Sequence, residues 1–268
     1  MKFLLQKDVL FDFIFALQKS KEWYDWWQPK ANIIEFVEEG CSKDICPVGS
    51  LEFCLDYYKQ LGIDLKPMNV PEKLWTCGIG YVPGVGSGKN ITLPDFMERL
   101  KKTNKIDDER FHHLMYEFSP GWFIKSEERF KAQGNGHYPS IGDFLNSQYY
   151  NQKEKYQIAR LEKGLLDEWR IFVFEGEILD IKRYASEDPR KFCLPSDDMI
   201  DLVLKEIDLP AYSFDLGVID PGLAWGREEK HRTVIIEIHD FFSTGLYGFD
   251  NYNRLPYMFY RSHLHKFL

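Results

Sequence analysis

The segment Thr233-Val-Ile-Ile-Glu-Ile-His-Asp240 decides which fold the sequence predicts. Its polar and apolar side chains alternate with the period of a β-strand. In a strand, Glu237 and His239 point to one face of the sheet, whereas Ile236 and Ile238 point to the other. One face of this strand is therefore expected to carry a carboxylate and an imidazole, and the opposite face is expected to be apolar.

A second strand with an acidic residue precedes this segment. In Tyr212-Ser-Phe-Asp215, the same alternation places Asp215 on the polar face and Phe214 on the apolar face. If both strands belong to one sheet, their carboxylates converge on its surface. Carboxylate oxygens there could hold a hard cation such as Mg²⁺.

An arginine-bearing hairpin is predicted further back in the chain. The segment from Trp169 to Tyr184 reads as two strands joined by a turn, and it is expected to bring Arg170 and Arg183 to the same region of the sheet. Guanidinium groups bind phosphate oxygens in pairs of hydrogen bonds. Two arginines that face acidic metal ligands therefore predict a polyphosphate site.

Composition and charge restrict the class of protein. Of the 268 residues, 44% are hydrophobic and 16% aromatic, which is typical of a globular chain. The net charge of −8 argues against broad nucleic-acid binding, which requires a basic surface. Charged residues interrupt the apolar run at the N-terminus, so we expect neither a signal peptide nor a membrane span. The five cysteines form no paired Cys-x-x-Cys unit, which indicates reduced thiols and a cytoplasmic protein.

The first third of the chain predicts a small α/β unit. Strands are expected over Lys2–Gln6 and Ile33–Val37, with a helix after the first of them. A further helix is expected within Cys46–Gly62, because Ser50 can cap its start and Gly62 stands where a left-handed residue ends a helix.

A glycine-rich region, Gly78 to Asn90, separates this unit from the rest. It is similar to a phosphate-binding P-loop, but the pattern requires glycine in place of Pro83 and Ser or Thr in place of Asn90. We therefore interpret it as a surface loop or linker. A helix that begins at Leu93 follows, and the predicted domains are residues 1–90 and 91–268.

The remaining two thirds predict strands that alternate with short helices. Trp122–Ser126 is a strand, and the loop after it contains Gly134 and Gly136. Lys125 and the backbone amides of such a loop could contact phosphates, although lysines before a polar loop are also ordinary surface residues. Further elements are expected over 141–149 (helix), 156–162 (strand), 196–206 (helix, with Met199, Leu202, Val203 and Ile207 facing the core) and 254–268 (helix).

Several of these segments together resemble the ATP-grasp superfamily, and within it the bacterial and phage clade named for two arginines and a lysine. The resemblance extends over nearly the whole chain. The segments that carry it are Cys46–Phe53, Phe123–Lys125 with Lys131, Glu168–Phe172, Lys182–Tyr184, Phe214–Gly217, Glu237–Asp240 and Gly245–Gly248.

The resemblance implies an α+β fold in which two subdomains clasp ATP, preceded by a small α/β pre-ATP-grasp domain. It also assigns roles to individual positions. Lys125 and Lys131 match phosphate-contacting basic residues, and the segment Glu162, Lys163 to Leu165 matches the one that meets adenine. Arg170 and Arg183 match the two catalytic arginines, Asp215 and Glu237 match ligands of Mg²⁺, and Asp240 matches the acidic residue that follows.

Two positions remain open within this assignment. The family usually has asparagine where this chain has His239, and an imidazole suits softer metals than Mg²⁺. His239 is therefore either a metal ligand or a neighbour of the ligands. Glu168 is expected either to orient Arg170 or to contact the nucleotide.

The activity that the resemblance implies is an ATP-dependent carboxylate–amine ligase with an acyl-phosphate intermediate. Its acceptor could be as large as a peptide or protein terminus, and its partners would be ATP, a carboxylate acceptor and an amine donor. Two alternatives remain: an assembly or interaction module that binds ATP without turnover, and a kinase that stops after phosphoryl transfer.

Overall fold

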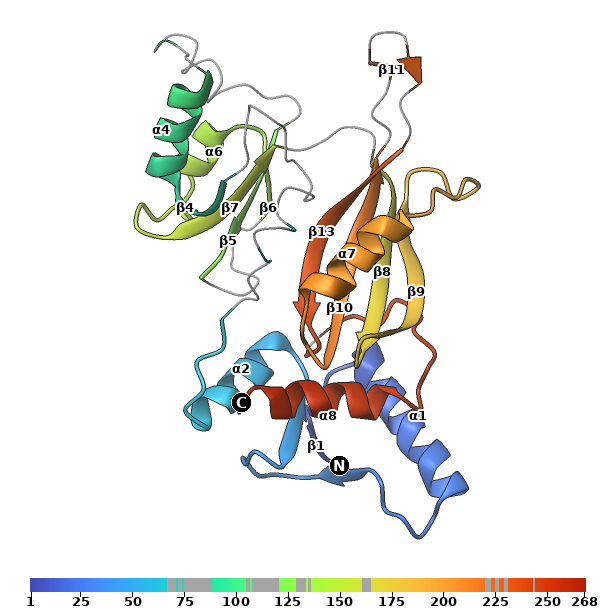
Figure 1. Cartoon of the computed structure of the whole chain (residues 1–268). Coiled ribbons are helices and arrows are strands. Elements are labelled where there is room, and N and C mark those ends of the chain that lie inside the picture. The colour runs from blue at the N-terminus through green and yellow to red at the C-terminus, as the bar shows by residue number, and fades with distance from the viewer. Residues whose placement is uncertain are drawn as a thin grey trace.

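The computed structural model describes residues 1–66, 71, 74, 88–104, 107, 121–128, 134, 136–160, 165–219, 223–224, 227–228, 231–242 and 244–268. These residues form three hydrophobic cores, each built around a sheet and its helices. Figure 1 shows the three parts as a basal unit, which holds both chain termini, and two sheets above it. None of the described helices is long and apolar enough to cross a membrane.

The basal unit is a parallel sheet, in the order β2-β1-β3, covered by helices. Its elements are β1 (Lys2–Leu5), α1 (Asp12–Trp27), β2 (Glu35–Val37), β3 (Ile45–Val48), α2 (Leu51–Gln60) and, from the other end of the chain, α8 (Leu255–His265). The hydroxyl of Ser50 accepts the amide hydrogen of Phe53 and so caps α2, as predicted. Gly62 has a φ of 78°, the left-handed conformation expected after a helix.

The predicted boundaries differ from the structure in this unit. The helix expected within residues 46–62 begins only at Leu51, because Ile45–Val48 pairs with β1 as a strand. The C-terminal helix α8 packs in the same core as the N-terminal strands, and Met258 and Phe259 are buried there beside Phe3. The core therefore joins residues from both sides of the predicted boundary at residue 90.

The second sheet is antiparallel in the order β4-β7-β5-β6, with two helices on one side. Its elements are β4 (Gly88–Thr92), α4 (Leu93–Asn104), β5 (Trp122–Ser126), β6 (Gly136–Tyr138), α6 (Ile141–Leu145) and β7 (Lys155–Arg160). Strand β5 matches its prediction, whereas α6 ends four residues earlier than expected. Trp122 and Ile124 alternate into the core, so Lys125 points to the other face.

The third sheet is antiparallel in the order β13-β10-β8-β9 and packs one face against α7. Its elements are β8 (Leu165–Phe174), β9 (Glu177–Ser186), α7 (Asp197–Glu206), β10 (Ala211–Ile219) and β13 (Arg232–Asp240), with a small pair β11 (Leu223–Ala224) and β12 (Arg227–Glu228) between the last two. The predicted hairpin is β8–β9, and it turns at Glu175 and Gly176, both with positive φ.

A β-bulge in β13 changes one part of the predicted alternation. Asp215 lies opposite Glu237, but Leu216 lies opposite Ile235, so Ile236 is an extra residue in the strand. As predicted, Ile238 is buried in the core under α7, but the second core position belongs to Ile235 and not to Ile236. The prediction for Ile236 was wrong because a strict period of two does not allow for an extra residue.

Candidate functional site

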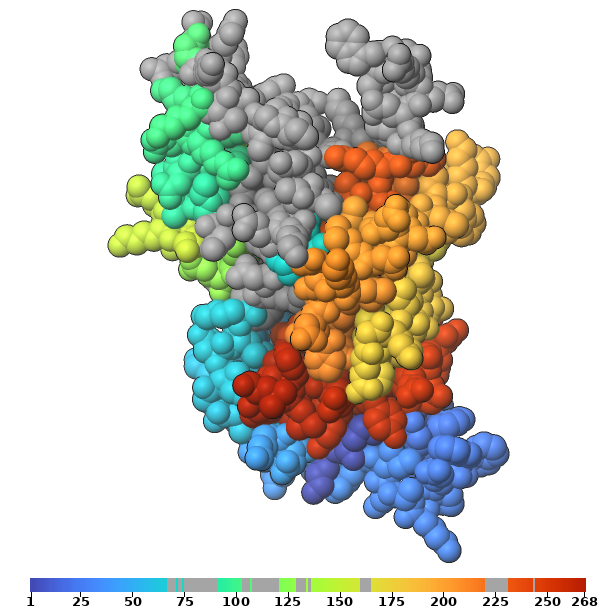
Figure 2. All heavy atoms as spheres, viewed as in Figure 1, coloured from blue at the N-terminus to red at the C-terminus, as the bar shows by residue number. Residues whose placement is uncertain are grey.

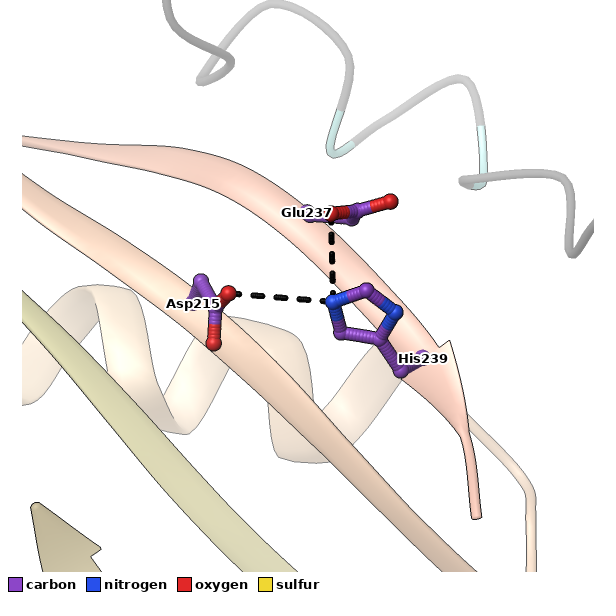
Figure 3. Close-up of side chains that lie close together, drawn as sticks. All are labelled: Asp215, Glu237 and His239. Carbon is purple, nitrogen blue, oxygen red and sulfur yellow. Dashed lines mark ion pairs between the residues drawn. The ribbon is translucent and has the colours of Figure 1, made fainter. Parts of the chain in front are cut away.

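The predicted polar cluster lies where three neighbouring strands meet. Asp215 in the central strand β10 is paired directly with Glu237 of β13 on one side and with Arg170 of β8 on the other. His239 follows Glu237 by two residues, and its Nε2 lies 3.2 Å from Glu237 Oε2 and 3.7 Å from Asp215 Oδ2 (Figure 3). The possible ligand atoms of these three residues lie within 4.8 Å of one another. Among the described residues, this group could hold a metal ion.

Arg170 is fixed inside this cluster by hydrogen bonds. Its Nε and one terminal nitrogen each donate to an oxygen of Asp215 at 2.7 Å, and the other terminal nitrogen donates to the Gly245 carbonyl at 3.1 Å. The side chains of Arg170 and Asp215 are 7% and 4% exposed. Such a buried two-pronged pair positions the guanidinium in one orientation, and this orientation faces the metal candidates.

Lys125 reaches the cluster from the other sheet. Its ammonium group contacts Glu237 Oε1, so a residue of β5 in the second sheet is joined to a residue of β13 in the third. The two residues are separated by 112 positions in sequence. Cationic and acidic residues from two subdomains therefore meet at one place, as predicted for Lys125, Arg170, Asp215 and Glu237.

The charged groups of the cluster stabilise one another in their ionised forms. Burial opposes ionisation of Asp215, but the hydrogen bonds from Arg170 and the nearby His239 keep its pKa below the ordinary value. Burial also opposes ionisation of Glu237, and His239 and Lys125 outweigh it, so that its pKa is lowered as well. Burial opposes charge on His239, yet the nearby carboxylates of Asp215 and Glu237 raise its pKa. Both carboxylates are therefore ionised at neutral pH.

Two tyrosines flank Arg170. The hydroxyl of Tyr184 donates to Glu168 at 2.8 Å and lies 3.3 Å from Asp215. Tyr247 stacks on Tyr184 with ring centroids 4.7 Å apart, and the guanidinium carbon of Arg170 lies 4.6 Å from the Tyr247 centroid. Glu168 is thus linked to the cluster through the Tyr184 hydroxyl. Among the described residues it forms no hydrogen bond with Arg170. Sequence reasoning missed both tyrosines as site residues, although Tyr184 lies two positions after Lys182, the register partner of Arg170.

An apolar surface adjoins the cluster on the same face of β10. Gly217 lies two residues after Asp215, and a side chain there would meet Leu165 Cδ1 at 2.7 Å and Ile236 Cδ1 at 3.1 Å. Val234 approaches the same point. Leu165, predicted to lie near adenine, is therefore part of an apolar group beside the charged cluster, together with Ile236 and Val234.

The structure does not bring Arg183 to this cluster. Arg183 pairs in register with Trp169, so it lies on the α7 face of the sheet, opposite the face of Arg170. Its Nε donates to Asp167 at 2.9 Å, and its terminal nitrogens donate to the carbonyls of Pro189, Asp188 and Lys191. It also stacks on Phe192 at 4.3 Å. These contacts hold the segment after β9 against the sheet.

We expect Arg183→Ala to destabilise the protein by about 2 kcal/mol, because it leaves the buried carboxylate of Asp167 with fewer partners. Urea denaturation would measure this loss. Arg190→Ala is the matched control, since Arg190 is 88% exposed in its pair with Asp188 and should change stability by less than about 0.5 kcal/mol. An unchanged stability of Arg183→Ala together with weaker ATP binding would contradict the structural role.

Several predicted positions cannot be placed. Lys131, Glu162 and Lys163, together with most of the glycine-rich region, lie outside the described residues. Asp240 is described, and it contacts Lys266 and accepts a hydrogen bond from Ser262 at 2.8 Å. It therefore joins the end of β13 to helix α8 in the basal unit.

Comparison with known proteins identifies the family. The model of the ATP-grasp domain, R2K clade family 2, matches residues 103–255, which is more than half of the chain. The chain belongs to this ATP-grasp family. No curated protein sequence matches it. The predicted resemblance to the clade named for two arginines and a lysine is thus confirmed.

Solved structures show the same ATP-grasp fold. A RimK-domain ATP-grasp protein from Sphaerobacter thermophilus DSM 20745 is 11% identical, with a TM-score of 0.50 over 100% of this chain and 99% of that chain. N5-carboxyaminoimidazole synthetase from Staphylococcus aureus, complexed with ADP, is 8% identical, with a TM-score of 0.50 over 97% of this chain and 76% of that chain. At these identities the similarity concerns the fold alone.

The donor set of this ATP-grasp chain fits a divalent cation in part. The carboxylates of Asp215 and Glu237 are hard oxygen ligands of the kind that Mg²⁺ prefers. The imidazole of His239 is a softer ligand and is less suited to that ion. Asp215 and Glu237 would therefore hold Mg²⁺, with His239 beside them as a hydrogen-bonding neighbour.

Proposed function

We propose that this protein is an ATP-dependent carboxylate–amine ligase that binds ATP between its second and third sheets. The observation that carries the proposal is the contact of Lys125 with Glu237, next to the Arg170–Asp215 pair. Phosphoryl transfer requires positive groups around the transferred phosphate, and this cluster contains two of them beside two carboxylates. The adjoining apolar surface of Leu165, Gly217 and Ile236 suits the flat face of an adenine ring.

The proposed reaction has two steps. A carboxylate oxygen of the acceptor attacks the γ-phosphorus of ATP, the bond to the β-phosphate oxygen breaks, and an acyl phosphate and ADP are formed. An amine then attacks the acyl carbon, loses a proton and expels inorganic phosphate, so that an amide results. Both steps use positioning and charge, and neither needs a nucleophile from the protein.

The roles of the residues follow from their contacts. Lys125 contacts Glu237, and it would turn from this carboxylate to the phosphates of bound ATP. Arg170 is held by Asp215 and Gly245 and would keep its position during the reaction. Mg²⁺ held by Asp215 and Glu237 would neutralise part of the negative charge of the triphosphate. The acceptor carboxylate would lie near Arg170 and the half-exposed side chain of Tyr247.

A second candidate function is an ATP-binding module without turnover. It is favoured by the dense pairing of the cluster, in which Arg170 binds both oxygens of Asp215, and His239 and Lys125 contact Glu237. Each of these contacts competes with a metal ion for the same oxygens. ADP release measured over a panel of carboxylic acids, amino acids and peptides distinguishes the two functions, because only the ligase shows hydrolysis that depends on an acceptor.

We expect ATP with Mg²⁺ to raise the melting temperature of the purified protein. Saturation at about 100 times the dissociation constant contributes about 2.7 kcal/mol, which is about 5 to 10 °C for a chain of this size. Differential scanning fluorimetry measures the shift, with Mg²⁺ alone and adenosine as controls. An equal melting temperature with and without ATP would contradict nucleotide binding, and both candidate functions with it.

A further inference from the structure

Helix α1 carries an exposed row of aromatic side chains in the basal unit, far along the chain from the charged cluster. The row, here called the aromatic stripe, consists of Phe15, Trp23, Trp26 and Trp27, which are 60%, 40%, 79% and 54% exposed. The opposite side of the helix is buried through Phe13, Ile14, Leu17 and Tyr24. Figure 2 shows this N-terminal region at the lower edge of the molecule, where it projects from the basal unit. Exposed aromatic patches of this kind mark interaction surfaces.

The stripe has a charged centre. Phe15 and Trp26 are eleven residues apart, about three helical turns, so both lie on the same side of α1 with a separation of about 16 Å. Between them lie Lys19 and Glu22, whose charged groups are 2.7 Å apart. The Lys19 ammonium is also 5.6 Å from the centre of the Phe15 ring. Along α1 this surface therefore carries an aromatic residue (Phe15), a basic one (Lys19), an acidic one (Glu22) and a second aromatic one (Trp26).

This order is complementary to itself when two copies of the helix lie antiparallel. A two-fold axis between residues 20 and 21 places Phe15 opposite Trp26 of the second copy and, in the same register, Lys19 opposite Glu22 of the second copy. Each contact occurs twice because the interface is symmetric. A parallel arrangement would instead oppose lysine with lysine and glutamate with glutamate. One antiparallel register therefore pairs aromatic with aromatic residues and lysine with glutamate at the same time.

We propose that α1 is a homodimer interface in which the aromatic stripes of two copies pack antiparallel about this axis. The four aromatic side chains expose on the order of 500 Å² in one copy, so two copies would bury about 1,000 Å², which is at the lower end of specific interfaces. A dimer of moderate strength, with a dissociation constant of about 10 to 100 µM, is expected from this area. The inference does not depend on the proposed ligase activity.

The charges of this surface fit a second copy better than an anionic membrane. Helix α1 carries Lys19 and Lys21 against Glu22 and Asp25, and each lysine is already paired within the helix. The surface is therefore electrically balanced, and the whole chain has a net charge of −8. Anionic lipid surfaces recruit helices whose polar face is basic, which this helix lacks.

Charge reversal tests the register directly. Lys19→Glu places four acidic side chains at the axis of a homodimer, and Glu22→Lys places four basic ones there. We expect sedimentation velocity to show at least about tenfold weaker self-association for each variant alone, whereas an equimolar mixture associates at least as tightly as the wild type. Trp26→Ser should weaken self-association by a similar factor without unfolding the protein, because the Trp26 side chain lies outside the core.

The control is a charge pair elsewhere in the basal unit. Lys2 and Glu35 lie 4.0 Å apart with half-exposed side chains on the paired strands β1 and β2, so Lys2→Glu, Glu35→Lys and their mixture should associate like the wild type. The proposal is overturned if the wild type stays monomeric up to about 200 µM. It is also overturned if Lys19→Glu and Glu22→Lys gain nothing on mixing, or if the wild type binds phosphatidylcholine vesicles without associating with itself.

Discussion

Replacement of Glu237 by glutamine is expected to reduce acceptor-dependent ADP release at least about 100-fold. Glutamine has nearly the same shape but no charge, so it removes the negative charge of a proposed Mg²⁺ ligand while the strand pairing with Asp215 remains. It also removes the charged partner of Lys125, the contact that joins the two sheets at this point. The measurement is ADP release with saturating ATP, Mg²⁺ and the best acceptor from a panel of carboxylic acids and peptides.

A binding measurement separates loss of the metal from loss of the nucleotide. For the wild type, isothermal titration calorimetry should show ATP affinity that falls when EDTA removes Mg²⁺. For Glu237→Gln, the affinity should be low with and without EDTA. Glu175→Gln is the matched control, because Glu175 lies in the exposed β8–β9 turn and pairs only with Arg261 among the described ion pairs. Full activity of Glu237→Gln would exclude this residue from the metal site.

The alternation of side chains was sufficient to predict most of the cluster. Asp215, Glu237 and His239 share a face because β13 is regular from Glu237 onward and Asp215 pairs with Glu237, and Arg170 could be placed beside them by its hairpin. A period of two is a local property, and it holds without knowledge of the rest of the chain. The sequence also predicted strand β5, which carries Lys125, but only the fold shows that Lys125 reaches Glu237 of β13.

The errors have physical causes that the sequence does not display. Arg183 was expected beside Arg170, yet a register shift between Phe172 and Val173 adds one residue to β9, so that Arg170 pairs with Lys182 and Arg183 lies on the opposite face. Ile236 was expected in the core, but a bulge makes Ile235 the core residue. Core sharing between α8 and β1 is also non-local, because Met258 and Phe3 are distant in sequence.

Truncation of Arg170 is expected to be among the most destabilising single changes in the described part of the chain, with a loss of about 3 to 5 kcal/mol for Arg170→Ala. The reason is that Asp215 would keep a buried charge after losing both of its 2.7 Å hydrogen bonds from Arg170. The Gly245 carbonyl would lose its donor as well, and with it the tie between β8 and the segment after β13. Urea denaturation in EDTA, which excludes metal binding to the freed carboxylate, measures the loss.

The double variant Arg170→Leu/Asp215→Leu tests this reason. If the cost of Arg170→Leu comes from the stranded carboxylate, the double variant should be more stable than the sum of the single changes predicts, by about 1 to 3 kcal/mol. Additive losses would instead assign the cost to packing. If the two changes are not additive, part of any activity lost in Arg170→Ala would come from the destabilised fold and not from the missing catalytic group. Arg170→Lys, which keeps a positive charge but cannot bind both oxygens of Asp215 in parallel, is the better variant for testing catalysis, provided that its melting temperature is measured alongside.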